Sequence, residues 1–464
     1  MSELVNPQLE RLLKKYPHPH RPFWDRPALS RRGFFQVLGT GISGYALFQV
    51  ARPLRLLAEL PVVPIGKARN CIFILLSGAP SHTDTFDLKE GSWTPASFNP
   101  TSFGDIRFPQ GLLPNLAERL GDLVLVRSVR AWALVHSLAQ TWIQIGRSPA
   151  SALGSIAPHI GSIVALEKAT ERTAQDLLPG FISLNAGGSQ VGAGYLPVTY
   201  APFQVQPSAG GLRNTTHPDG RTRWEGRVRV LHTMDDPLRK NSPLGQLPTD
   251  MDNFYQAASQ LMYNDRVQSA FSMTTEERQA FGNTGFGDAC LIATKVLGAD
   301  LGTRFIQITL GGWDHHANIY AAASLPRMAG QLDTGLAALL DGLRGSSLLD
   351  QTLVVVAGEF GRTVGPPNNQ QGRDHFLQQT VVFAGAGVHG GRAIGATDER
   401  GAGIVDPGWS RGREIKSEDL EATVYSALGI NWTITRRDDP FNRGFEYVPY
   451  ADQDIYGPIH ELWQ

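Results

Sequence analysis

The sequence predicts an α/β fold in which a mainly parallel sheet is sandwiched between helices. Hydrophobic residues make up 42% of the 464 residues, which is enough for a sizeable core. Short, continuous apolar runs are typical of strands that are covered on both faces. Their alternation with helical patterns favours parallel strands joined by right-handed crossovers. The predicted strands are Cys71–Leu76, Leu123–Val126, Phe181–Leu184, Phe305–Leu310, Leu353–Val356 and Val381–Ala384.

Two helices stand out by their patterns. One carries a leucine stripe at helical spacing, formed by Leu332, Leu336, Leu339, Leu340 and Leu343. The other begins at Ser417 with a plausible N-cap and an acidic first turn, and it runs toward Gly429.

The strand–helix rhythm breaks over residues 202–285. This stretch opens with several prolines and glycines and continues into a polar helical region around Asp252–Met273. We therefore expect an insertion or cap on the same domain. The predicted organisation is a targeting segment and linker over residues 1–60, followed by one α/β domain over residues 61–464.

The overall charge excludes some partners. Charged residues make up 18% of the chain and the formal net charge is -1, so no broad field favours nucleic acid or an acidic membrane. The two cysteines, Cys71 and Cys290, are expected to be buried free thiols, because one opens an apolar run and the other lies in a predicted helix.

A paired arginine near the start predicts the destination of the chain. Ser30-Arg31-Arg32-Gly33-Phe34-Phe35 leads into a modestly apolar stretch that ends at Ala51 and is followed by basic residues. This layout is typical of a twin-arginine signal, so we expect the translocation machinery as a partner and a periplasmic or extracellular location. Glycines and polar residues make the stretch a poor membrane span. No clean cleavage site is evident, so an uncleaved anchor, the one expected contact with a membrane, remains open.

Histidines and carboxylates follow several of the predicted strands. In open α/β sheets, sites form outside the carboxyl ends of the strands. Imidazoles and carboxylates there are ligands for divalent metals, so we expect one shared metal site, with zinc, manganese, magnesium and calcium all open. The predicted ligands are His82, Asp84, Asp314, His315, His316, Glu359, Asp374 and His375.

Two arginines lie beside these ligands. A guanidinium suits a tetrahedral oxyanion, so Arg362 is a candidate for binding one, and Arg373 is its neighbour in the same group. Both are equally placed to pair with a carboxylate, Glu359 or Asp374.

The motifs in these segments resemble a known family. They are Pro80-Ser-His-Thr-Asp-Thr-Phe-Asp87, Gly311-Gly-Trp-Asp314, Glu359-Phe-Gly-Arg-Thr363 and Gly372-Arg-Asp-His375. With the paired arginine, they resemble a twin-arginine-exported family of unknown function related to the alkaline phosphatase–sulfatase superfamily. The resemblance covers nearly the whole chain. It implies a parallel-sheet sandwich with a metal site at the carboxyl edge. The predicted ligands together with Arg362 lead us to expect hydrolysis of a small anionic ester of phosphate or sulfate.

The resemblance also implies roles for individual residues. Asp84 best matches the acidic ligand after the first strand. Asp314 with His316 or His315 resembles an Asp–His ligand pair, and His375 fits a downstream ligand. Phe360 stands where a further histidine ligand is expected.

The catalytic group is less clear from the resemblance. His136 takes the place of the sulfatase nucleophile, with Ser137 beside it. Ser137 as nucleophile, His136 as acid, base or ligand, and attack by water all stay open. So do an isomerase or mutase and a non-catalytic extracytoplasmic binding or assembly protein on the same fold.

Overall fold

A computed structural model of the chain describes residues 62–464, except 240–241, 243–244 and 246. The twin-arginine motif at Ser30–Phe35 lies outside the described residues. Residues Val63–Gln464 form one compact unit. Among the residues described, no helix has the length and apolar character needed to cross a membrane.

The centre of this unit is an eight-stranded sheet with the order β12-β4-β11-β8-β1-β7-β5-β6. Every predicted strand is present within a few residues of its expected bounds, and the predicted mainly parallel α/β fold is confirmed. Only β11 runs antiparallel to both of its neighbours, β4 and β8. The strands are β1 (Asn70–Leu75), β4 (Leu123–Arg130), β5 (Phe181–Leu184), β6 (Phe203–Val205), β7 (Phe305–Thr309), β8 (Thr352–Ala357), β11 (Gln378–Ala384) and β12 (Arg392–Ile394).

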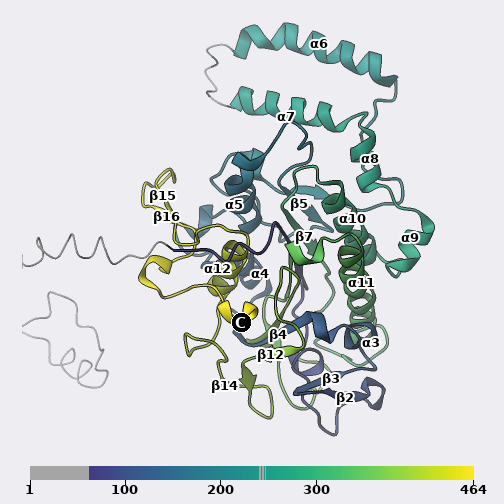
Figure 1. Cartoon of the computed structure of the whole chain (residues 1–464), viewed down its shortest axis with the longest axis vertical. Helices are drawn as coiled ribbons and strands as arrows, with labels where there is room; N and C mark the ends of the chain where they lie inside the picture. Colours follow the sequence, from purple (N-terminus) through teal and green to yellow (C-terminus); the bar gives the residue numbers. More distant parts are fainter. Residues whose placement is uncertain (1–61, 240–241, 243–244, 246) are drawn as a thin grey trace, which may run out of the picture. The chain divides into compact units, whose positions relative to one another are not determined.

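Helices cover both faces of the sheet because its central strands are apolar on both sides. Alternate residues of β1 enter different cores: Ile72 and Ile74 join one, and Phe73 and Leu75 join the other. The first core includes α3 (Pro114–Ala117), α10 (Gly285–Ala299) and α11 (Leu325–Gly345); the second includes α4 (His136–Ile145), α5 (Ile160–Glu167) and α12 (Ser417–Ala427) (Figure 1). Cys71 and Cys290 are buried free thiols, as predicted.

The two predicted helices are both present. The whole leucine stripe of α11 is buried. The α12 helix starts at Ser417, but its N-cap is Lys416, one residue earlier than expected. The reason is that the Asp419 carboxylate accepts a hydrogen bond from the Lys416 backbone N–H at 2.9 Å, which closes the first turn.

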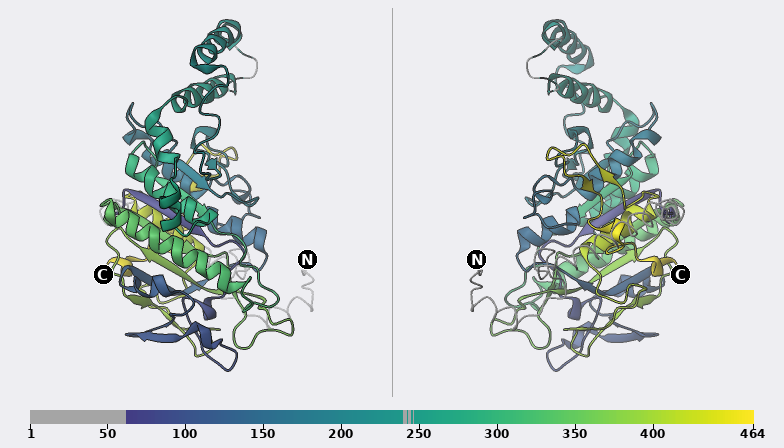
Figure 2. Two further views of the ribbon diagram at one scale, coloured as in Figure 1. Left: turned by 90° about the vertical axis from the view of Figure 1, so that its right-hand side faces the viewer. Right: turned by 90° about the vertical axis from the view of Figure 1, so that its left-hand side faces the viewer.

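Residues 202–285 hold the edge strand β6 and then a run of helices. These are α6 (Gly220–Arg239), α7 (Leu247–Leu261), α8 (Asp265–Phe271) and α9 (Thr275–Ala280). Figures 1 and 2 show α6 and α7 lying side by side, away from the sheet.

The described loops also form four small two-stranded sheets. One of them positions functional side chains: β9 pairs with β10 and sets Arg362 opposite His375. The strands are β2 (Pro100–Phe103) with β3 (Ile106–Pro109), β9 (Gly361–Arg362) with β10 (His375–Phe376), β13 (Ala396–Thr397) with β14 (Ile404–Asp406), and β15 (Thr435–Arg436) with β16 (Phe445–Glu446).

Candidate metal centre

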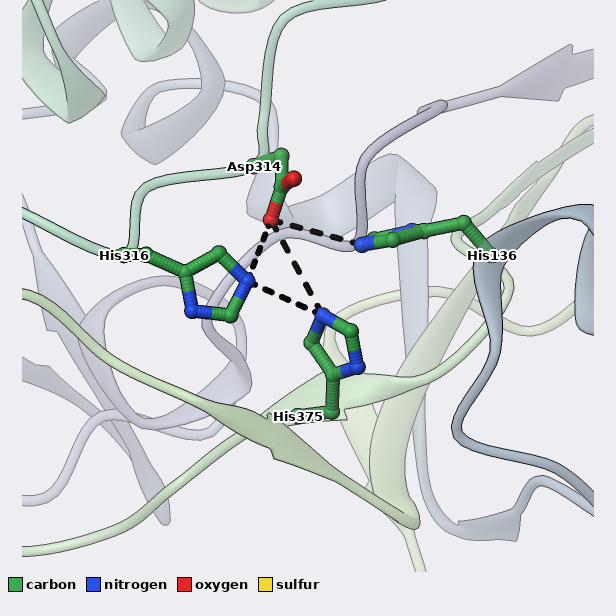
Figure 3. A group of neighbouring side chains, drawn as sticks. All are labelled: His136, Asp314, His316 and His375. Atoms are coloured by element: carbon green, nitrogen blue, oxygen red, sulfur yellow. Dashed lines mark hydrogen bonds and ion pairs between the residues drawn. The ribbon is translucent and has the colours of Figure 1, made fainter.

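Four side chains from three separate parts of the chain meet at the carboxyl edge of the sheet. His136 is the first residue of α4, Asp314 and His316 follow β7, and His375 lies in β10. One ligand atom from each lies within 4.8 Å of the other three. We call these four residues the histidine cluster (Figure 3).

Gly78, just after β1, lets the loops of this edge approach each other. Its φ is +105°, and a Cβ there would lie 2.7 Å from the backbone nitrogen of Asp314, so only glycine fits. The Gly78 N–H donates to Glu359 Oε1 at 2.9 Å, and its carbonyl accepts from Arg362 at 2.5 Å. Gly78 thus links the loops after β1 and β8, and the loop after β7 is joined next to it, where the Gly312 N–H donates to the Ser77 carbonyl at 3.1 Å.

The cluster is compact around one carboxylate oxygen. Asp314 Oδ1 lies 3.0 Å from His316 Nε2, 3.3 Å from His136 Nε2 and 4.0 Å from His375 Nε2. The Nε2 atoms of His316 and His375 are 3.0 Å apart. Figure 3 shows the three rings and the carboxylate directed toward a common point.

In each of the three imidazoles, the Nδ1 atom contacts a hydrogen-bond acceptor. His136 Nδ1 contacts Glu359 Oε1 at 2.6 Å, His316 Nδ1 contacts Asp374 Oδ1 at 3.0 Å, and His375 Nδ1 contacts the Leu134 carbonyl at 2.6 Å. Carboxylates and carbonyls only accept, so we assign the ring proton to Nδ1 in all three histidines. The lone pair of each Nε2 then faces the centre, which is the arrangement found in metal-binding histidines.

Among the described residues, His316 Nε2 has a cationic neighbour in Arg362, whose terminal nitrogen lies 3.3 Å away. In the assigned tautomers, the Nε2 atoms of His316 and His375 are both acceptors and cannot bond to each other. His136 Nε2 is buried and has no hydrogen-bond partner within the described part of the chain. Desolvation, then the nearby cationic groups including Arg362, lower the pKa of His375 despite its bond to Leu134. The Nε2 lone pair of His375 is therefore available to a divalent cation.

The charges of the cluster favour cation binding. Desolvation tends to raise the pKa of Asp314, but the hydrogen bond and charge of Arg362, with His136 and His316, prevail and lower it. Asp314 is thus ionised at neutral pH. The pKa of His136 is raised chiefly by its hydrogen bond to Glu359, against the opposing effect of desolvation.

Arg362 holds Asp314 in place. Its side chain is only 1% exposed, and one terminal nitrogen donates to Asp314 Oδ1 at 2.6 Å. The other guanidinium nitrogens donate to the backbone carbonyls of Ala79, at 2.9 Å, and Arg373, at 3.1 Å. The guanidinium is committed to protein acceptors, and its carboxylate partner is Asp314 and not either of the two expected from the sequence.

The donor set narrows the choice of cation. Three imidazole nitrogens and one carboxylate oxygen suit zinc and related transition metals, whereas magnesium and calcium prefer oxygen ligands throughout. The side chains of Asp314 and His316 are 47% and 41% exposed, so the centre is open to solvent.

Asp84, the expected ligand after the first strand, does not join the cluster. Its carboxylate forms a buried ion pair with Arg373, with contacts of 2.6 and 3.1 Å. It also accepts hydrogen bonds from Ser81 at 2.6 Å and from Tyr320 at 2.8 Å. Both oxygens are therefore already occupied, and we refer to this arrangement as the Asp84–Arg373 pair.

Two of the predicted histidine ligands also lie outside the cluster. His82 is buried, its Nε2 contacts the Gly401 carbonyl at 2.9 Å, and burial lowers its pKa. His315 is half-buried, and its pKa is lowered by desolvation first and then by Arg362. Glu359 and Asp374 stand behind the imidazoles of His136 and His316 as hydrogen-bond acceptors.

The remaining predicted residues surround the centre. Phe360 fills the place where a further histidine was expected, with its ring 4.7 Å from the rings of His136 and His375. Ser137 is exposed in the first turn of α4, beside His136. The sequence did not indicate the Leu134 carbonyl or Gln140, whose amide donates to Glu359 at 2.9 Å, because neither residue type is distinctive by itself.

The family of the chain follows from comparison with known proteins. The profile of the family described as "Protein of unknown function (DUF1501)" matches residues 68–441. The chain belongs to this family. A search of curated proteins finds no match.

Several solved structures match this chain at low sequence identity and low TM-score. A PsFucS1 sulfatase from Pseudoalteromonas sp. is 13% identical, with a TM-score of 0.38, and the match covers 82% of this chain and 70% of that one. An alkaline phosphatase superfamily protein from Vibrio parahaemolyticus is 12% identical, with a TM-score of 0.35 and coverages of 79% and 69%. A phosphonate monoester hydrolase of Agrobacterium radiobacter is 13% identical, with a TM-score of 0.36 and coverages of 78% and 74%.

Proposed function

We propose that this protein is a metal-dependent hydrolase of phosphate or sulfate esters. The observation that carries the proposal is the convergence of three Nε2 atoms and the Asp314 carboxylate, with every Nδ1 held by an acceptor. When bound there, a cation of the zinc class supplies Lewis-acid chemistry toward an ester oxygen or water. His136, Asp314, His316 and His375 are its proposed ligands.

The start of α4 favours an anionic substrate. His136 is the first residue of this helix, and the N-cap, Val135, has no side-chain oxygen to bond the first-turn N–H groups. Such a helix end presents backbone donors and a partial positive charge, both suited to the oxygens of a phosphate or sulfate. These donors lie beside the centre because His136 belongs to both.

Two groups compete as the nucleophile. The Ser137 hydroxyl is exposed in the same turn as His136, and water is the alternative. His136, bonded to Glu359 through Nδ1, orients its Nε2 toward the centre in either case. A Ser137→Ala variant separates the two, because it abolishes turnover only if the hydroxyl attacks.

The test combines metal analysis with turnover. Purified protein is analysed for bound metal and then assayed on an aryl phosphate and an aryl sulfate with zinc, manganese, magnesium or calcium. We expect one cation per chain and turnover that is lost in Asp314→Asn and His316→Ala. His315→Ala is the matched control, because His315 lies in the same loop but outside the cluster.

A second candidate is a non-catalytic binding or assembly protein that keeps the cation site. The aromatic ring of Phe360 at an expected ligand position favours it. Bound metal without hydrolysis of either ester would support this candidate. Absence of both bound metal and turnover with every cation would overturn the hydrolase proposal.

We also propose that Ser30–Phe35 directs export of the folded protein through the twin-arginine machinery to the periplasm or beyond. The support is the paired arginine ahead of a weakly apolar stretch. Replacing Arg31 and Arg32 together by lysine is expected to retain folded protein in the cytoplasm. Unchanged export of this variant would contradict the proposal.

A further inference from the structure

A cavity is lined by Trp142 of α4, by the segment that follows this helix and by Trp132 before it. Its volume is about 450 Å³, and its walls include Trp132, Trp142, Arg147, Arg443 and Tyr450. Trp142 follows His136 by six residues in the same helix, a rise of about 9 Å at 1.5 Å per residue. The cavity is thus separate from the centre but within reach of an extended ligand.

The aromatic wall of this cavity is held rigidly. The rings of Trp132 and Trp142 stack with centroids 5.8 Å apart. Both indole N–H groups donate to the buried carboxylate of Glu418, at 2.8 and 3.1 Å. Trp132 is nevertheless 42% exposed. Lys416 Nζ lies 4.0 Å from the centroid of the Trp132 ring, so the indole pair offers an exposed aromatic edge with a cation beside it.

Tyr450 also lines the cavity and is exposed, in a backbone conformation that large residues rarely adopt. Its φ is +55°, and its side chain is 52% exposed. Its backbone N–H donates to the Glu446 carboxylate at 3.3 Å. Strain of this kind persists where the surroundings impose it, often at ligand sites.

Two guanidinium groups of the lining retain donor capacity. Arg147 is 5% exposed, and its Nε has no hydrogen-bond partner in the described part of the chain, although another of its nitrogens bonds the Tyr447 carbonyl at 2.9 Å. Arg443 is exposed, and its side chain makes no ion pair or hydrogen bond with any described residue. The two carboxylates of the lining, Glu418 and Glu446, already accept hydrogen bonds.

We propose that this cavity binds a saccharide carrying anionic groups, as part of an extended substrate whose ester lies at the histidine cluster. The inference therefore rests on the proposed function. Aromatic rings stack against the C–H faces of sugar rings, and guanidinium groups bind sulfate, phosphate or carboxylate substituents. The segment before α4 links the sites: Trp132 walls the cavity, and the Leu134 carbonyl bonds His375.

The test measures binding of a heparin-derived tetrasaccharide and of neutral maltotetraose by calorimetry, using metal-loaded and metal-free full-length protein. We expect the sulfated probe to bind and the neutral probe to bind at least tenfold more weakly. Arg443→Ala should weaken binding of the sulfated probe at least tenfold. Arg400→Ala, which removes another exposed arginine outside the cavity, is the matched control and should not.

The outcomes separate this inference from the proposed function. Asp314→Asn should abolish turnover of aryl esters but leave tetrasaccharide binding in place. Arg443→Ala should weaken tetrasaccharide binding but leave turnover of aryl esters in place. If the protein hydrolyses no ester, the binding data still test whether the cavity binds an anionic saccharide. Equal binding of both probes, or unchanged binding by Arg443→Ala and Trp132→Ala, would overturn the proposal.

Discussion

The histidine cluster and the Asp84–Arg373 pair lie at the same edge of the sheet but differ in exposure and in how their aspartates are paired. Each contains an aspartate beside a buried arginine. In the pair, both Asp84 oxygens and the guanidinium are mutually satisfied, and the side chains are 2% and 0% exposed. In the cluster, Asp314 is 47% exposed, and three imidazoles face it with their Nε2 lone pairs.

This difference separates a candidate cation site from a structural ion pair. Asp84 is neutralised by a group within the chain, so it has no charge left to offer to a ligand. Asp314 shares Arg362 with three backbone carbonyls and with His316 Nε2, and it still lies close to the Nε2 atoms of all three imidazoles. The pair should therefore control stability, and the cluster should control metal affinity.

The largest effect is expected from breaking the pair. Asp84→Asn leaves the Arg373 guanidinium buried without its counter-charge, which should lower the free energy of unfolding by about 3–5 kcal/mol. Urea denaturation measures it, with the exposed Asp350→Asn as control. Metal affinity should stay unchanged; a loss of metal without a loss of stability would make Asp84 a ligand after all.

Removal of a cluster imidazole should give the complementary result. His316→Ala deletes one proposed ligand and is expected to weaken zinc binding by more than about 100-fold, exceeding the effect of an outer partner. Competition with a chelator measures the affinity. The metal-free variant should unfold at nearly the wild-type urea concentration. A fully retained zinc affinity would remove His316 from the site.

A smaller loss is expected from the outer partner of the same histidine. Asp374→Ala removes the acceptor that fixes the Nδ1 proton of His316, so zinc affinity should fall by about 10-fold, at the lower end for such residues, because Asp374 is 57% exposed. The same competition assay applies. A loss as large as that of His316→Ala would indicate that Asp374 binds the cation itself.

The smallest effect is a shift in pH dependence. Because the pKa of His136 is raised by Glu359, protons compete with the cation from above pH 6.5. Zinc affinity should be constant above that raised pKa and decrease as the pH falls through it. Glu359→Gln removes the cause of the shift and should move this decrease to lower pH. An unmoved midpoint would show that His136 does not govern the competition.

The fold was largely predictable because its strands are buried on both faces. A continuous run such as Leu353–Val356 needs no context to indicate a central strand. The antiparallel direction of β11 was less evident. After β8 the chain forms the β9–β10 pair at the carboxyl edge and then enters β11 from that same edge. Because no crossover helix carries the chain back to the other edge first, β11 runs antiparallel to β8. The edge strands β6 and β12 are too short to stand out.

The site was predictable in its residue types but not in its pairing. Because His316 and Asp84 both follow a predicted strand, the sequence predicted both as metal ligands. Whether a carboxylate is free to bind a ligand depends on contacts between segments that are distant in sequence. Asp84 is paired by Arg373, which lies just before β10 and next to Asp374 in the sequence. Likewise, the tautomer of His375 depends on the Leu134 carbonyl, which any residue there would supply.

The most direct test of the central claim is the coordination of a bound cation. X-ray absorption at the zinc edge, together with an anomalous-scattering crystal structure of zinc-loaded protein, would identify the ligands. We predict one zinc per chain, bound by the Nε2 atoms of His136, His316 and His375 and by Asp314, at about 2.0–2.2 Å. Zinc bound at Asp84 instead, or no zinc at the cluster under saturating conditions, would contradict it.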